Sequence, residues 1–374
     1  MWSKGATHER FLQQLMQAHA KNSKSSSWLR VLFSGEHWRY KSLHETLKVL
    51  ADPSKYQELE YHAQNNMTQW QKHSSAAPAQ IDVSTQDWGT VCSAVTQQYG
   101  EPYTVLNHAS DRFPGGGFLK GGSAQEENIW HRSNCALSLE EKHIGFDPST
   151  GSFCYDNHMS QMVSAELPMN HAEQKTLAQL LGYERSDAHR VYLSLLPRIC
   201  FRGPEHLINY EHVEERNGKN TIFADPDFSF QFLPENTIFP FYELRSAAPN
   251  LASEDFHFDN PKQFENYQQA IQRCIAAQLD TLILHGKKHL VLGAWGCGEF
   301  HNDPNIIAKT YRDEIYKRAH HFQHIVFAIL RTASHHHINH TAFQNHLAGL
   351  PLGSKAPTIS LPLDDTSNNT PRMK

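Results

Sequence analysis

The order of short apolar segments along the chain constrains its fold most strongly. Six runs rich in branched and aromatic residues occur in the order YTVLNHAS, HRVYLSLL, RICFRG, IFPFYELRSAAPN, HLVLGAWGCG and HIVFAIL. A helical pattern over residues 261–289 separates the fourth and fifth runs, and another over 304–322 separates the last two. Strands that alternate with helices pair in parallel through right-handed crossovers. The sequence therefore predicts a three-layer α/β fold with a mixed, largely parallel central sheet.

The two ends of the chain differ from this central region. Residues 6–20 have one apolar stripe, and residues 44–73 predict more helix with a break at Pro53. A polar segment over residues 74–80 follows, and proline and polar residues dominate the last part of the chain. We expect a helical N-terminal extension over 1–80, an α/β domain over 81–345 and a loosely ordered tail over 346–374.

Composition excludes several classes of protein. The chain has 374 residues, of which 39% are hydrophobic, enough for a buried core. Its apolar runs are far shorter than the roughly 20 residues of a membrane span, and its N-terminus lacks the apolar stretch of a signal peptide. The formal charge of −5 comes without a clustered basic face. We therefore expect a cytoplasmic protein with no nucleic-acid or membrane partner, although delivery into another cell stays open.

The cysteines and histidines do not predict a metal site. The six cysteines lie at least nineteen residues apart, which excludes a CxxC zinc pair and favours reduced thiols. Histidines cluster in SHHHINH and HHFQH, but without the HExxH spacing. The sequence therefore predicts no functional metal.

Two glycine-rich segments follow apolar runs. They are NHASDRFPGGGFLKGG, after the run that ends near Leu106, and GAWGCGEF over residues 293–300. Ligands of open α/β sheets bind where strands end, and bare glycines let backbone N–H groups approach an anion. The second segment has no lysine and is not a Walker A loop, and it lacks the GxGxxG spacing. Either both segments help to bind an anion, or they form only tight turns.

A pair of carboxylates follows the first glycine segment. Ser123 and Glu126 have the spacing of a capping box, which would account for Glu126 but not for Glu127. Cleavage of a glycosidic bond also needs two carboxyl groups, one to deliver a proton and one to fix hydroxyls and stabilise the transition state. A capped helix start and a catalytic pair therefore both remain open.

These residues together resemble a known family. The segment VLNHASDRFPGGGFLKGGSAQEENIWHRS (105–133) is similar to the signature of bacterial-type poly(ADP-ribose) glycohydrolases, a macrodomain family marked by GGG, a short spacer and QEE. The segments LRSAAPN (244–250) and 290–315 resemble its later motifs, whereas 134–243 resembles it poorly. The resemblance implies a macrodomain-like fold and a hydrolase that binds ADP-ribose and cleaves the glycosidic bond at the distal ribose, with no cofactor.

The resemblance also implies roles for individual residues. Asn107 would contact the distal ribose, and Gly115, Gly116 and Gly117 would surround that ribose and the diphosphate. Glu126 would hold ribose hydroxyls and Glu127 would act as the main acid/base, with Gln125 in the same catalytic element. The later positions form a diphosphate loop followed by an adenine contact: Gly293, Ala294, Gly296, Cys297, Gly298 and Phe300.

One departure from the family bears on the substrate. Glu299 places a negative charge where apolar residues are commoner, and Asp303 and Asp313 follow on the same segment. An acidic rim would suit a cationic leaving group such as arginine better than another ADP-ribose unit. The substrate is therefore either poly(ADP-ribose) or a protein with a single linked ADP-ribose. A third alternative is a protein that binds ADP-ribose without cleaving it.

Overall fold

The computed structural model describes residues 13–19, 21, 37–208, 223–252, 256–330 and 336–356. Its centre is a mixed sheet. The order across the sheet is β1 (Gln80–Ser84), β11 (His324–Ala328), β10 (His289–Leu292), β2 (Thr104–His108), β9 (Phe239–Ser246) and β5 (Tyr192–Leu193), with β6 (Arg198–Cys200) also on β9. The first four neighbouring pairs in this order are parallel, whereas β5 and β6 both pair antiparallel with β9. This arrangement confirms the fold class expected from the alternating runs.

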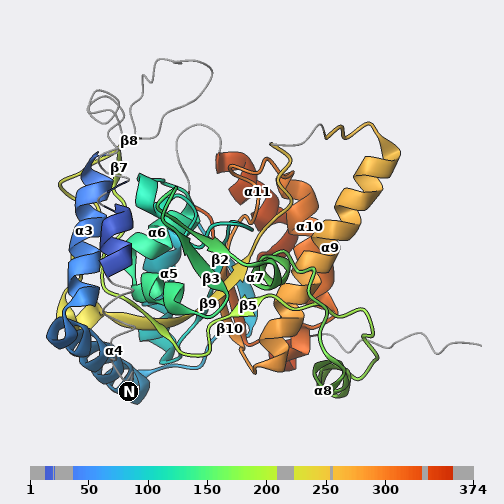
Figure 1. Ribbon diagram of the computed structural model, residues 1–374. Helices are drawn as coiled ribbons and strands as arrows, with labels where there is room; N and C mark the ends of the chain where they lie inside the picture. The colour runs from blue at the N-terminus through green and yellow to red at the C-terminus, as the bar shows by residue number, and fades with distance from the viewer. Residues whose placement is uncertain are drawn as a thin grey trace, which may run out of the picture.

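Helices cover both faces of the sheet, as Figure 1 shows. Successive residues of a strand point to opposite faces. Val105 of β2 accordingly packs in one core, whereas Leu106 packs in the other. The first core is covered by α3 (His37–Ala51), α4 (Pro53–His73), α5 (Trp88–Tyr99) and α6 (Gln125–Arg132). The second is covered by α8 (His171–Leu181), α9 (Pro261–Leu284), α10 (Pro304–Tyr316) and α11 (His336–Leu347).

The long middle segment, residues 134–243, adds small elements, of which β5 and β6 pair with β9. β5 and β6 correspond to the predicted runs HRVYLSLL and RICFRG, but they are short. The segment also holds two small antiparallel hairpins. Its other elements are η2 (Asn134–Glu140), β3 (Ile144–Asp147), β4 (Ser152–Tyr155), α7 (Asn157–Val163), β7 (Leu207–Ile208), β8 (Phe223–Ala224) and η3 (Glu235–Thr237).

The N-terminal helices share a core with the sheet. Pro53 breaks the helical pattern as predicted, because α3 ends at Ala51 and α4 begins at Pro53, where Asp52 accepts hydrogen bonds from the backbone N–H groups of the first turn. Leu43 and Leu47 of α3 are fully buried in the core that contains Trp130 of α6. The helical segment therefore lies on the α/β region as part of one packed body.

Part of the predicted tail is also packed. Leu347 and Leu352 are buried, and the backbone N–H of Leu352 donates to the carbonyl of Ala79. Residues 346–356 therefore continue the fold, and the rest of the predicted tail, residues 357–374, lies outside the described part of the chain. Of the helices that the structure describes, none is both long and apolar enough to cross a membrane.

Candidate active site

A cavity of about 480 Å³ opens where the parallel strands end. Parallel strands direct their carboxyl ends to the same edge of the sheet, so the loops after β2, β10 and β11 all reach this place. Gly116 from the first glycine segment lines the cavity, and so do Gly296 and Gly298 from the second. The structure thus places the two predicted segments in one shared cavity.

The side chain of Gln125 fixes the start of α6 against the end of β2. Its Nε2 donates to the carbonyl of Leu106 at 2.7 Å, and its Oε1 accepts from the backbone N–H of His108 at 2.9 Å. Both polar groups of the amide are used, so its orientation is determined by the backbone around it. These two hydrogen bonds position the next two residues of α6, Glu126 and Glu127, at the cavity.

Glu126 binds the backbone of the first glycine segment. Its Oε2 accepts from the N–H of Ser110 at 2.8 Å, and its Oε1 accepts from the N–H of Gly115 at 3.0 Å. The capping box considered from the sequence is absent: the N-cap of α6 is Ala124, and no side chain caps it. The carboxylate turns to the glycine segment because the N–H groups there are otherwise unsatisfied.

Only one carboxylate oxygen of Glu127 accepts a hydrogen bond from the described residues. Its Oε1 accepts from the N–H of Gly117 at 2.6 Å. Its Oε2 is buried and has no hydrogen-bond partner among the described residues. Glu127 lines the cavity, so a buried oxygen without a partner belongs to a side chain of the cavity wall. A buried polar atom without a partner is costly and is characteristic of functional sites.

The environment of the two carboxyls favours their protonated forms. Burial raises the pKa of Glu126 well above its usual value, the neighbouring Glu127 adds to the shift, and the N–H of Ser110 opposes it. Burial also raises the pKa of Glu127, where the N–H of Gly117 opposes the shift and Glu299 adds to it. A carboxyl that keeps its proton above the usual range can act as a general acid near neutral pH.

The second glycine segment is fixed by hydrogen bonds from side chains to backbone carbonyls. Trp295 donates from Nε1 to the carbonyl of Ser246 at 2.8 Å, and Asn302 donates from Nδ2 to the carbonyl of Gly296 at 3.0 Å. Gly296 has a φ of +74°, the left-handed region that favours glycine. Ala294, Glu299 and Phe300 also line the cavity. This segment therefore contributes rigid backbone and two aromatic residues, Trp295 and Phe300, to the cavity wall.

Other predicted residues lie outside the cavity wall. Gly293 and Cys297 do not line it; Cys297 packs against the core, where burial raises the pKa of its thiol and disfavours a nucleophilic thiolate. Asp303 caps α10 by accepting from the N–H groups of Asn305 and Ile306. Asp313 lies near the other end of α10 and pairs with Arg312. The structure thus brings Glu299, but neither aspartate, to the cavity.

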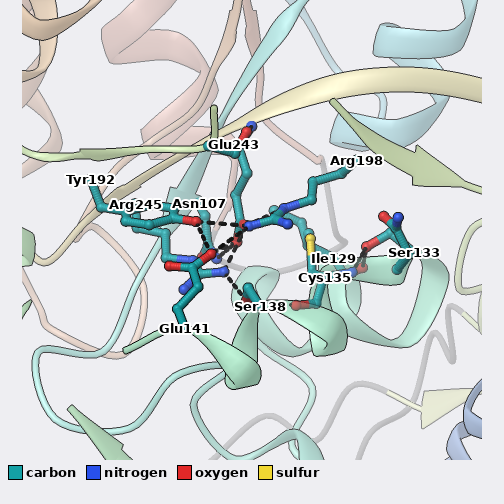
Figure 2. Close-up of polar contacts among 12 residues, drawn as sticks. Asn107, Ile129, Ser133, Cys135, Ser138, Glu141, Tyr192, Arg198, Glu243 and Arg245 are labelled. Carbon is teal, nitrogen blue, oxygen red and sulfur yellow. Dashed lines mark hydrogen bonds and ion pairs between the residues drawn. The ribbon is translucent and has the colours of Figure 1, made fainter. Parts of the chain in front are cut away.

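Asn107 belongs to a buried network beneath the site, drawn in Figure 2. Its Nδ2 donates to Oε1 of Glu243 at 2.9 Å, and its Oδ1 has no partner among the described residues. Arg245 and Arg198 both pair with Glu243. Burial alone would raise the pKa of Glu243, but these two arginines and Asn107 outweigh it and lower the pKa to about 2. Asn107 is therefore fixed as part of a charged network rather than as cavity wall.

Several lining residues were not predicted from the sequence. Arg39 comes from α3, Asp87 and Trp88 start α5, and Glu205 and Leu207 come from the middle segment. They lie far apart in the sequence and carry no local motif, so only the topology brings them together. The remaining unpredicted lining residues are His108, Ser110, Ser123, Ala124, Asn128, Ala248, Trp295, Ala328, Ile329, Leu330 and Asn339.

The described residues also contain no group of three or more His, Cys, Asp or Glu side chains that could hold a metal ion. Among the acidic residues of the cavity, Asp87 is paired with Arg132, whose Nη1 lies 2.5 Å from its Oδ1.

Residues 36–163 match the family described as microbial-type PARG, catalytic domain. The chain is similar to this family. The matched residues include α3, α4, the first glycine segment and both glutamates of α6. The PARG match therefore crosses residue 80, where composition had suggested a domain boundary. No curated protein matches the chain.

Solved PARG structures resemble the chain in fold. Poly(ADP-ribose) glycohydrolase from Thermomonospora curvata is 23% identical, with a TM-score of 0.50, over 83% of this chain and 100% of that one. The same protein bound to the inhibitor ADP-HPD gives 23% and 0.50, over 83% and 99%. The Deinococcus radiodurans PARG in complex with ADP-ribose gives 22% and 0.44, over 76% and 91%. The Thermomonospora structures support the predicted macrodomain-like fold.

Proposed function

We propose that this protein is an ADP-ribosyl glycohydrolase that binds ADP-ribose and hydrolyses the glycosidic bond at the distal ribose. The observation that carries the proposal is that Glu127 lines a cavity shared by both glycine segments and that its Oε2 is buried without a hydrogen-bond partner among the described residues. The match to the microbial-type PARG catalytic domain supports it. The fold relatives include a PARG bound to the inhibitor ADP-HPD, which is consistent with such a ligand here.

The ligand would bind between the two glycine segments. Backbone N–H groups near Gly116 and Gly296 can approach a diphosphate closely, because no side chain intervenes. Phe300 offers an aromatic face to the adenine. The distal ribose would then lie over the first segment, next to the carboxyls of Glu126 and Glu127.

The bond would be cleaved by proton transfer from Glu127. Its Oε2, protonated because burial raises the pKa, donates the proton to the leaving oxygen as the bond from that oxygen to the anomeric carbon breaks. The positive charge that develops on the ribose is stabilised by the nearby carboxyls. A water molecule then adds to the anomeric carbon and gives its proton back to Glu127. Glu126, held by two backbone N–H groups, positions the ribose hydroxyls.

A second candidate substrate is a protein with a single ADP-ribose on arginine. Glu299 favours it, because this carboxylate lines the cavity and lies close enough to Glu127 to affect its pKa. A cationic leaving group would be attracted to such a position. On this alternative the same carboxyls act on an N-glycosidic bond, and only the leaving group differs.

The test compares three substrates under the same conditions. Release of ADP-ribose is measured from poly(ADP-ribose), from an arginine-modified protein and from a glutamate-modified protein. Turnover of the polymer supports the first substrate, and selective release from arginine supports the second. Tight binding of ADP-ribose without any turnover would instead identify a non-catalytic reader and would contradict the proposed chemistry.

The proposed partner is an ADP-ribosylated protein or polymer in the cytoplasm. The net charge of −5 and the absence of a clustered basic segment in the sequence argue against a nucleic-acid partner. Fractionation of the producing cells, with antibodies against the protein, checks the location. Recovery in the secreted fraction would contradict it.

A further inference from the structure

The charged side chains that line the cavity are acidic, with the exception of one arginine. Among the described residues that line it, Arg39 is the only arginine or lysine. Five acidic residues share the wall with it: Asp87, Glu126, Glu127, Glu205 and Glu299. A diphosphate carries negative charge, so an anionic ligand in this cavity gains most from the one permanent cation.

The guanidinium of Arg39 is held in place from two sides. Its Nε donates to Oε1 of Glu205 at 3.1 Å, and its Nη2 bonds the same oxygen. The guanidinium carbon lies 4.8 Å from the centre of the Trp38 ring. Arg39 is only 8% exposed. These contacts fix the orientation of the planar group before any ligand arrives.

One corner of the guanidinium remains free. Nη1 of Arg39 has no hydrogen-bond partner among the described residues, and it is not among their fully buried unpaired atoms. Arg39 lines the cavity, so a ligand there lies beside the side chain that carries this unpaired N–H₂ group. A fixed guanidinium with a free N–H₂ corner is a strong donor to phosphate oxygens.

Two of the acidic residues of the wall are already paired with arginines. Asp87 is paired with Arg132, and Glu205 is paired with Arg39 itself. The backbone N–H groups of the first glycine segment are partly occupied by Glu126 and Glu127. Backbone donors alone are therefore fewer than the glycine content suggests, which leaves a role for a cationic side chain.

We propose that Arg39 binds the diphosphate of ADP-ribose through Nη1, while Glu205 and Trp38 hold its guanidinium in position. This inference rests on the proposed function, because it takes ADP-ribose as the ligand. The diphosphate is the only anionic part of that ligand, so it is the part that a cation would contact. Helix α3 then supplies a binding residue to the site.

The test is titration calorimetry with ADP-ribose and with adenosine, which lacks the diphosphate. Arg39→Gln should weaken ADP-ribose binding roughly 10- to 100-fold and leave adenosine binding unchanged. Arg39→Lys, which keeps the charge but loses the planar fork, should fall between the two. The affinity of the parent for ADP-ribose should decrease as salt is added, and Arg39→Gln should reduce this dependence. Arg312→Gln, on the exposed side of α10, is the matched control.

A second variant separates binding from folding. Glu205→Gln removes a negative charge near the diphosphate but keeps an oxygen that can accept from Arg39, so ADP-ribose should bind as tightly or more tightly. Equal losses of affinity for ADP-ribose and for adenosine in Arg39→Gln would show a structural role and overturn the inference. A loss of ADP-ribose affinity in Glu205→Gln as large as that in Arg39→Gln would do the same. Unchanged binding by Arg39→Gln would overturn it alone. A parent protein that does not bind ADP-ribose would overturn the proposed function as well.

Discussion

The carboxylate of Glu127 leaves no room for a side chain on Gly116: a Cβ at Gly116 would lie 2.5 Å from Oε1 of Glu127. The same atom would lie 2.9 Å from Oε2 of Glu126. Gly116 also has a φ of +56°, which other residues rarely adopt. The backbone at this position is therefore shaped by the two carboxyls that it faces.

Substitution of Gly116 should damage both the fold and the site. Gly116→Ala is expected to reduce the free energy of unfolding by about 1–3 kcal/mol, because it adds backbone strain and a steric clash. It should also lower hydrolysis, since the carboxyls must move to make room. Thermal unfolding and substrate turnover measure the two effects. Gly145→Ala is the control, because a Cβ there would meet nothing within 4 Å. Equal behaviour of the two variants would contradict the prediction.

Loss of the carboxyl at position 127 should abolish turnover but not binding. Glu127→Gln keeps an oxygen that can accept from the N–H of Gly117, but it cannot donate and regain a proton. We expect hydrolysis to fall roughly 10²- to 10⁴-fold, with ADP-ribose affinity within a few-fold of the parent. Glu58→Gln on the exposed face of α4 is the matched control. Full activity in Glu127→Gln would rule out the proposed acid.

The same variant should change how stability depends on pH. Burial raises the pKa of Glu127 in the folded protein above its usual 4.5. Between pH 4.5 and this raised pKa, the folded protein therefore binds more protons than the unfolded chain. The stability contributed by protonated Glu127 is present below pH 4.5 and is lost as the pH rises toward the folded pKa. Glu127→Gln lacks this loss and should gain stability over the parent through this window, by about 1.4 kcal/mol per pKa unit. Urea unfolding from pH 4.5 to 8 measures the difference, and a constant difference would contradict it.

The buried network under the site should tolerate little change. Arg245→Met would leave Glu243, which is fully buried, without its main partner. We expect a loss of about 3–5 kcal/mol in the free energy of unfolding. Arg312→Met removes an exposed pair with Asp313 and should cost less than about 1 kcal/mol. Urea unfolding of both variants checks the prediction. A small effect of Arg245→Met would show that the network is not required for folding.

Features that depend on neighbouring residues could be predicted from the sequence. The apolar runs gave β2, β9, β10 and β11, because a strand buried on both faces reads as a continuous apolar stretch. β1 was missed because polar residues interrupt its apolar pattern, as in QIDVS. The glycine segments and the two glutamates of α6 could be located because each is a local motif.

Features that depend on distant residues could not be predicted in this way. The contact between Asn107 and Glu243 joins positions 136 residues apart, and that between Arg39 and Glu205 joins positions 166 apart. No spacing rule reaches across such distances, so only the tertiary fold pairs them. Asp303 was predicted at the rim of the site, yet the following Pro304 is a helix-start signal that fits its capping of α10.

The burial of α3 and α4 bears on how shortened forms of the protein should be designed. A protein cut at residue 81, where composition changes, would uncover the apolar surface that Leu43 and Leu47 now shield and would lose Arg39. Freshly exposed surface of this kind promotes aggregation. Leu15 and Ala18 are buried in the same core. Truncation for crystallisation or for inhibitor screening should therefore retain α3, α4 and these two residues.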